Sequence, residues 1–174
     1  MSNNLKILKF PNPRLRKIAE KVTKFDKSLE KLAHDMLEVM YAENGIGLAA
    51  TQVDKHIRLI VIDVSDERNF PQFFVNPTFE ILNTDQVHTF EEGCLSVPGF
   101  NEEITRPSNI VLKWDDLSGV AHTDTPSGLL TVCIQHEIDH LDGILFVDHV
   151  SSLKRNMILR KLTKAKRQGV LETA

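Results

Sequence analysis

Two histidines four residues apart constrain this chain more than any other feature. His136 and His140 belong to an H-E-x-x-H sequence inside a stretch, residues 128–141, that is predicted to be helical. This spacing places both imidazoles on one face of a helix, one turn apart, where they can bind a single metal ion. Glu137 lies beside them and can reach a water molecule on that ion. The sequence therefore predicts a metal-binding helix.

The same face of the predicted helix continues toward its N-terminus through Leu129 and Cys133. An apolar stripe of this kind is typical of a helix in the core. It is equally typical of a helix that lines an apolar substrate pocket. The pattern alone leaves both interpretations open.

A catalytic site of this type usually has three protein ligands and a water molecule. Downstream residues do not supply the third ligand, because Phe146 occupies the metzincin histidine position and the next glutamate is the distant Glu172. Cys133 lies about 10 Å along the helix axis from His140, too far to share an ion held between the histidines. Cys94, in a separate segment, is favoured as the third ligand over the alternative of a buried structural thiol.

Helical patterns occur at residues 26–42, at 128–141 and at 151–168, and strand patterns fill much of the middle. The order predicts an α+β fold, and the length of 174 residues predicts a single domain over residues 1–174. The predicted strands are Ile57–Val64, Phe73–Asn76, Thr78–Leu82, Ile104–Arg106 and Ile110–Trp114.

Composition excludes several classes of protein. No apolar run is long enough to cross a bilayer, and the N-terminus lacks the pattern of an export signal. Two cysteines cannot build a disulfide scaffold, so a reduced, cytoplasmic chain is expected. The net charge of −3 argues against a general DNA-binding protein, yet residues 154–168 carry seven basic and no acidic residues. This basic helix is either a solvated surface helix or a site for an anionic partner.

Three segments together resemble the motifs of the peptide deformylase family. Gly45–Gln52 reads G-I-G-L-A-A-T-Q, Glu91–Pro98 reads E-E-G-C-L-S-V-P, and Gln135–Gly143 reads Q-H-E-I-D-H-L-D-G. They follow one another in the family's order and spacing, and the similarity runs from about Ile7 to the basic helix. Thr125–Ser127 departs from the family's usual sequence just before the third motif.

The resemblance implies a fold of mostly antiparallel or mixed sheets wrapped around the central H-E-x-x-H helix, with one helix near each end of the chain. It implies an enzyme that removes the N-terminal formyl group from formyl-methionyl nascent polypeptides and releases formate. Cys94, His136 and His140 would hold one divalent ion, with Fe²⁺ expected as the native metal and Zn²⁺, Ni²⁺ or Co²⁺ as alternatives. Metal-bound water would attack the formyl carbon, with Glu137 as general base and then acid.

Further roles follow from the same resemblance. The side-chain amide of Gln52 and the backbone N–H of Leu95 would stabilise the oxyanion. The remaining predicted substrate-binding residues are Gly45, Ile46 and Gly47 along the peptide backbone, Leu129 and Cys133 in the methionine pocket, Glu92 at its edge or behind the metal site, and Arg106 facing the peptide. The basic helix, residues 151–168, would contact the ribosome.

Two other functions remain to be tested. One is a general H-E-x-x-H metallopeptidase, which uses the same metal chemistry on internal peptide bonds. The other is a non-catalytic, metal-stabilised protein that binds the ribosome through its basic helix. The first lacks a downstream third ligand, and the second does not explain Glu137 and Gln52.

Overall fold

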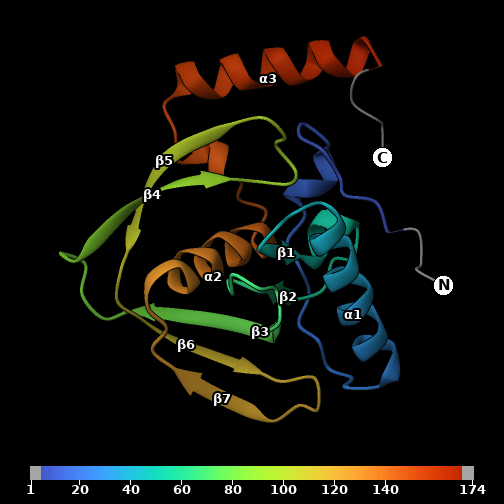
Figure 1. The fold of residues 1–174 in the computed structure, drawn as a ribbon, viewed down its shortest axis with the longest axis vertical. Coiled ribbons are helices and arrows are strands. Elements are labelled where there is room, and N and C mark those ends of the chain that lie inside the picture. Colours follow the sequence, from blue (N-terminus) through green and yellow to red (C-terminus); the bar gives the residue numbers. More distant parts are fainter. Residues whose placement is uncertain (1–4, 170–174) are drawn as a thin grey trace.

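The computed structural model describes residues 5–169 and has an α+β architecture, as predicted (Figure 1). Two antiparallel sheets and three α-helices make up the fold. The helices are α1 (Lys27–Ala42), α2 (Gly128–Leu141) and α3 (Ser152–Arg167). The strands are β1 (Gly47–Ala49), β2 (Leu59–Ile62), β3 (Gln72–Ile81), β4 (Val87–Gly93), β5 (Asn101–Pro107), β6 (Ile110–Asp115) and β7 (Ala121–Asp124).

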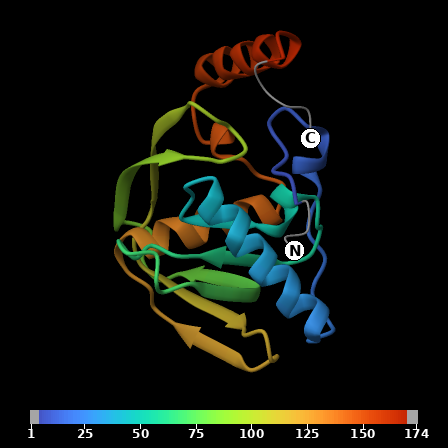
Figure 2. The same ribbon diagram turned by 45° about the vertical axis from the view of Figure 1, so that its right-hand side comes forward.

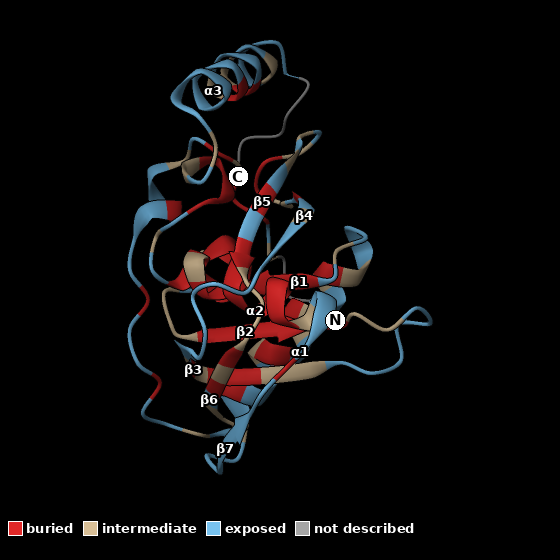
Figure 3. Ribbon diagram, turned by 90° about the vertical axis from the view of Figure 1, so that its left-hand side faces the viewer, coloured by how far each residue is buried: buried red, intermediate tan, exposed pale blue. Residues whose placement is uncertain are grey.

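The helix that carries the histidines lies between the two sheets. Figure 1 shows α2 with the β4–β5 pair on one side and β3, β6 and β7 on the other. The larger sheet has the order β1-β2-β3-β6-β7, and every neighbouring pair in it is antiparallel. Ten of the 14 residues of α2 are buried (Figure 3), which agrees with the predicted central position of this helix.

The core on this side of the larger sheet is built from α2 and the strands beneath it. Ile134, Ile138 and Leu141 join one apolar cluster with Ile60 and Phe74. The start of α2 differs in detail from the expectation for such a helix. Ser127 occupies the N-cap position, but its side chain makes no capping hydrogen bond, and Gly128 has a left-handed φ of 60°.

Helix α1 covers the opposite face of the larger sheet. Asp26 caps it by accepting hydrogen bonds from the N–H groups of Ser28 and Leu29. Its buried face, which includes Met36 and Met40, packs in a second apolar cluster with Leu48, Leu59, Val61 and Val75. The larger sheet is therefore covered by helices on both sides.

The predicted strands Phe73–Asn76 and Thr78–Leu82 form one strand, β3, with an irregularity between them. Asn76 has a left-handed φ of 51°, and the register between β3 and β6 shifts between Val75 and Thr78. The Asn76 side chain bonds to Val22 and Asp115, which stabilises this bulge. Three strands were not predicted: β1 has three residues, β7 is exposed throughout, and β4 is mostly exposed.

Helix α3 lies at the edge of the molecule, beyond the β4–β5 pair (Figure 2). Its two buried residues, Ile158 and Leu162, share an apolar cluster with Phe10, Val97 and Ile104. Lys154 adds an ion pair of 2.5 Å to Glu102 on β5. Among residues 5–169, no helix has the length and apolar character needed to span a bilayer.

Candidate active site and metal centre

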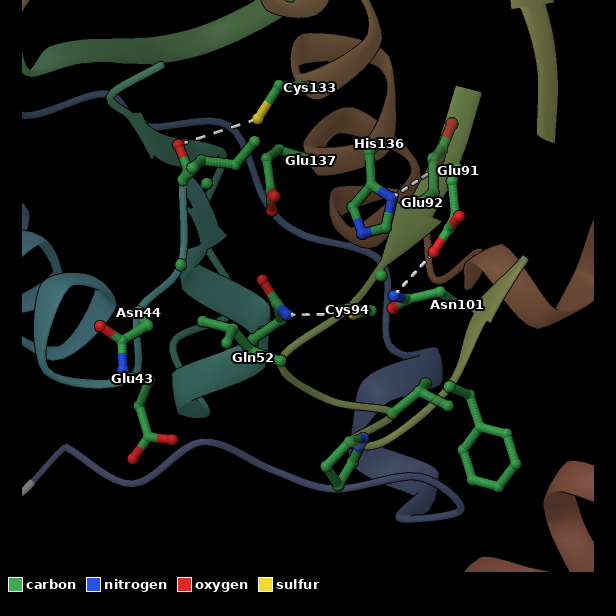
Figure 4. A pocket seen from close by; sticks show the side chains of 18 of the residues that line it. Glu43, Asn44, Gln52, Glu91, Glu92, Cys94, Asn101, Cys133, His136 and Glu137 are labelled. Carbon is green, nitrogen blue, oxygen red and sulfur yellow. Dashed lines mark hydrogen bonds and ion pairs between the residues drawn. The ribbon is translucent and has the colours of Figure 1, made fainter. Parts of the chain in front are cut away.

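Cys94, His136 and His140 meet at one point in the fold. Their ligand atoms lie within 4.8 Å of one another, and Cys94 Sγ is 3.2 Å from His140 Nε2. The two histidines come from α2 and the cysteine from the turn that follows β4. Figure 4 shows His136 and Cys94 at the pocket. The β4–β5 pair brings residue 94 to the helix, although the chain separates them by more than 40 residues.

The two cysteines of the chain are both free thiols, but their surroundings differ. Burial would raise the pKa of the Cys94 thiol, yet the charges of His140 and His136 and their hydrogen bonds hold that pKa well below its usual range. For Cys133, burial and the nearby Glu137 and Glu92 carboxylates raise the pKa well above that range. Cys94 is thus suited to the thiolate form that binds metals, and Cys133 stays a neutral thiol.

The ring of His136 is fixed from behind by Glu92. His136 Nδ1 lies 2.8 Å from Glu92 Oε2, and because a carboxylate only accepts, the imidazole N–H donates. This hydrogen bond leaves Nε2 available as a metal ligand. Burial opposes ionisation of Glu92, but hydrogen bonds from His136 and Arg106 lower the pKa of this carboxyl overall.

These three side chains fit a divalent transition metal. One thiolate and two imidazoles suit zinc, ferrous iron, cobalt or nickel, whereas calcium and magnesium prefer oxygen ligands. Within residues 5–169, this is the one group of three such side chains close enough together to hold an ion. The donor set is also compatible with an additional ligand from solvent, as catalytic centres require.

Glu137 is buried next to this cluster. It is 4% exposed, and its Oε2 atom has no hydrogen-bond partner among the described residues. Burial raises the pKa of Glu137 to about 6, while His136 and His140 act in the opposite direction. Gly47 makes this position possible, because a Cβ atom there would lie 2.5 Å from Glu137 Oε1.

The amide of Gln52 has a fixed orientation toward the same cluster. Its Oε1 atom accepts a hydrogen bond of 2.8 Å from the Ala49 N–H, so its NH₂ group must face the other way. Nε2 lies 3.1 Å from Ser96 Oγ and 3.6 Å from Cys94 Sγ. Gln52 therefore stabilises its loop and also presents an N–H group at the site.

Leu95 follows the cysteine directly and is half-buried. Its carbonyl oxygen accepts a hydrogen bond of 2.8 Å from Lys9 Nζ. Within the described part of the chain, its own N–H donates to no protein acceptor. This N–H is available to a bound ligand.

A cavity of about 470 Å³ opens beside these groups. Its lining includes most of the predicted site residues: Gly45, Ile46, Gly47, Gln52, Glu92, Cys94, Leu95, Leu129, Cys133, His136 and Glu137. His140 is buried and does not line the cavity. Of the predicted apolar stripe on α2, Cys133 packs in a core cluster and also lines the cavity, whereas Leu129 is exposed and only lines the cavity.

Arg106 does not face this cavity. Its guanidinium is buried and donates to Glu92 through Nε and Nη2, and to Asp139 through Nη1. These hydrogen bonds raise the pKa of Arg106 in spite of its burial. Arg106 is not among the residues that line the cavity, so the structure lends no support to the predicted contact between Arg106 and a peptide.

Sequence reasoning missed several residues of the site. Ser96 and Lys9 hold Gln52 and Leu95, and Glu43, Asn44, Glu91 and Asn101 line the cavity (Figure 4). Asp139, within the H-E-x-x-H segment, was also missed. It follows Gln135 by four residues, and residues at this spacing share a helix face, which was the available sequence signal. In the structure, the Gln135 side chain donates to the Pro107 carbonyl oxygen.

Comparisons with known proteins agree with this geometry. The family model described as "Polypeptide deformylase" matches residues 4–156. The peptide deformylase of Cellvibrio japonicus is 52% identical over 95% of this chain and 98% of its own length. The corresponding protein of Pseudomonas aeruginosa is 51% identical over 94% of this chain and 97% of its own.

Solved structures give the same result. A peptide deformylase from Legionella pneumophila superposes with a TM-score of 0.86 at 46% identity, covering 96% of this chain and 98% of that one. The Ehrlichia chaffeensis enzyme, crystallised with actinonin, superposes with a TM-score of 0.89 at 38% identity and covers 96% and 99%. With the metal-binding triad, the buried glutamate and nearly complete coverage in agreement, this chain belongs to the peptide deformylase family.

Proposed function

We propose that this chain hydrolyses the formyl amide at the N-terminus of formyl-methionyl nascent peptides, at a metal centre formed by Cys94, His136 and His140. The observation that carries the proposal is this triad beside a cavity, with a buried and otherwise unpaired carboxylate next to it. Formate and a free amino terminus are the products, as expected for the peptide deformylase family.

Cys94, His136 and His140 would hold one divalent ion, and we propose Fe²⁺ as the native one, with Zn²⁺, Ni²⁺ and Co²⁺ as alternatives. Such an ion supplies Lewis-acid chemistry and lowers the pKa of water in contact with it. Two of the proposed ligands are pre-organised for metal binding. Glu92 fixes the orientation of the His136 ring, and the pKa of the Cys94 thiol is held well below its usual range.

Glu137 is the proposed general base and acid. Its unpaired Oε2 atom can accept a proton from the attacking water and later deliver it to the leaving amine. Gly47 leaves room for the carboxylate in this position, because a Cβ atom there would lie 2.5 Å from Glu137 Oε1.

Gln52 and Leu95 are proposed to stabilise the negative charge that develops on the formyl oxygen. The Gln52 NH₂ group is oriented by Ala49, and the Leu95 N–H has no protein acceptor among the described residues. Preorganised donors of this kind typically contribute about 10²–10³-fold to turnover.

The peptide itself would bind along Gly45, Ile46 and Gly47. Strand β1, which starts at Gly47, is an edge strand of the larger sheet, and an edge strand can pair with an extended peptide. Leu129 and Cys133 line the same cavity from α2 and would contact the methionine side chain. Glu92 takes part by holding His136.

The test is purification under anaerobic conditions with metal analysis, followed by measurement of formate release. We expect formate from formyl-Met-Ala and about one equivalent of bound transition metal. Met-Ala without the formyl group, and a peptide with only internal bonds, serve as controls. Cleavage of internal bonds would instead favour the H-E-x-x-H metallopeptidase, and metal binding without any hydrolysis would favour the non-catalytic alternative.

A second proposal concerns the basic helix. Lys154 is paired with Glu102, Arg155 with Asp148, and Lys161 lies over the Phe100 ring. The other basic residues of α3 form no ion pair within residues 5–169, namely Arg160, Lys164, Lys166 and Arg167. We propose that these four contact phosphates of ribosomal RNA.

Ribosome binding at two salt concentrations tests this proposal. Four phosphate contacts should weaken binding about 10²-fold between 50 and 200 mM salt. Replacement of the four residues by glutamine should remove most of that dependence. Binding that hardly changes with salt would contradict the proposal.

A further inference from the structure

A continuous chain of hydrogen bonds runs from the proposed metal ligand His136 to the protein surface. His136 donates to Glu92, and Arg106 donates to Glu92 over 2.6 and 3.0 Å. The same guanidinium donates to Asp139 Oδ2 over 2.8 Å, and His149 Nε2 lies 2.8 Å from that oxygen. His149 is 36% exposed, so the chain ends at solvent.

Arg106 connects two parts of the fold that must meet at the metal centre. It belongs to β5, Glu92 to β4 and Asp139 to α2. Gln135 adds a second link, because its Nε2 atom donates over 2.9 Å to the carbonyl oxygen of Pro107. Since β4 leads directly to Cys94 and α2 carries both histidines, these contacts fix the thiol-bearing segment relative to the imidazoles.

Stability alone does not explain a buried group of this composition. Replacing a buried ion pair by apolar side chains of similar volume is often neutral or stabilising, because desolvation of the charges offsets their attraction. Here one guanidinium faces two carboxylates, and all three are largely buried. What the arrangement does supply is a fixed orientation for the Glu92 carboxylate and hence for the His136 ring.

We propose that Arg106 and Asp139, with His149 at the surface, are positioning residues that hold His136 in its metal-binding orientation through Glu92. The inference rests on the proposed metal centre and extends it to three side chains that do not touch the cavity. None of them is a catalytic residue. Their removal should lower metal affinity and alter the geometry at the metal, while the affinity for the peptide stays nearly unchanged.

Four variants test the proposal, and a fifth, Arg106→Ala, is used for chemical rescue. Arg106→Met removes the link between the carboxylates, Asp139→Asn weakens it, and His149→Ala removes only its outer end. Arg58→Met is the matched control, because Arg58 also bonds to a carboxylate near α2, Asp142 at 2.6 Å, but makes no contact with Glu92. Each protein is freed of metal and titrated with Co²⁺ against a chelator, and the visible Co²⁺ absorption spectrum is recorded.

We expect Arg106→Met to bind Co²⁺ about 10–100-fold more weakly than the original chain, with a changed spectrum. Asp139→Asn should lose less, His149→Ala least, and Arg58→Met nothing. The metal-loaded variants should show a fall in kcat with little change in KM. Addition of guanidinium ion to Arg106→Ala should restore part of the affinity, which a general loss of stability would not allow.

An unchanged Co²⁺ affinity and spectrum in Arg106→Met and Asp139→Asn would overturn the inference. A rise in KM alone would also overturn it, because it would indicate that Arg106 contacts the peptide. If Arg106→Met fails to fold, Asp139→Asn and His149→Ala decide the matter by the same two readouts. Failure of the original chain to bind Co²⁺ or release formate would instead overturn the proposed function.

Discussion

Helices α2 and α3 have similar lengths, 14 and 16 residues, but opposite relations to the rest of the molecule. Ten residues of α2 are buried, including the charged or polar His136, Glu137 and His140. In α3, two residues are buried and the cations face outward. Figure 3 shows the contrast, with α2 among buried elements and α3 mostly exposed.

The difference shows what burial does for chemistry. Inside the fold, neighbouring groups orient two of the charged or polar side chains of α2: Glu92 accepts a hydrogen bond from His136, and Arg106 donates one to Asp139. On α3, similar charges are surrounded by water, which screens them. We therefore place the proposed catalytic groups on α2 and the proposed contacts with ribosomal RNA on α3.

The largest expected effect comes from the carboxylate of α2. Glu137→Gln keeps the size of the side chain but cannot accept a proton, so formate release should fall about 10²–10⁴-fold. The metal content should remain, because the proposed ligands are Cys94, His136 and His140. Formate assays and metal analysis on the same sample check this. Near-normal turnover would remove Glu137 from the mechanism.

Truncation of one buried isoleucine in each helix compares their roles in stability. Ile134 in α2 and Ile158 in α3 are both fully buried. Ile134→Ala should lower the free energy of unfolding by about 2–5 kcal/mol, because it leaves a cavity in the central core. Ile158→Ala should lower it by less than about 2 kcal/mol, since α3 can detach without opening that core. Urea denaturation measures both, and equal losses would mean that α3 belongs to the main cooperative unit.

Gly47→Ala tests how closely β1 approaches the catalytic helix. The new Cβ atom would lie 2.5 Å from Glu137 Oε1 and 2.7 Å from Cys133 Sγ, so the carboxylate must move. A displacement of about 1 Å can reduce turnover about 10²-fold. Adding Cys133→Ala removes one of the two contacts and should recover part of the loss. Full activity of Gly47→Ala would show that Glu137 has a second productive position.

The smallest effects are expected on the outer face of α3. Lys164→Gln and Lys166→Gln remove exposed cations without ion-pair partners among residues 5–169. Each should change the free energy of unfolding by less than about 0.5 kcal/mol and leave formate release from short peptides unaltered. Thermal unfolding and the peptide assay check both points. A large loss of activity would mean that α3 affects the cavity directly.

Much of the helical structure and part of the metal site could be predicted from local sequence. The spacing of His136 and His140 fixes their common helix face, and the periodicity of α1, α2 and α3 gave these helices to within a residue or two. The strands were harder to predict. The exposed β4 and β7 lack an apolar alternation, and β1 has only three residues, so pairing with distant segments decides their conformation.

Side chains with more than one plausible role were also beyond local sequence. From sequence alone, a charged residue such as Arg106 could equally contact a peptide or form a surface ion pair. In the structure it is instead buried between two carboxylates from different elements, Glu92 and Asp139. The orientation of the Gln52 amide could be stated only from the structure, where the Ala49 N–H donates to its Oε1 atom.

The sequence by itself determined which residue types can bind a metal, and it determined that two of them share a helix face, because helix geometry depends only on local spacing. The tertiary structure alone decided that Cys94 reaches these histidines, that Glu137 is buried with Oε2 unpaired among the described residues, and that Glu92 and Asp139 bind Arg106. Distance in space, burial and desolvation arise from the packing of segments far apart in the chain, and no local pattern encodes them.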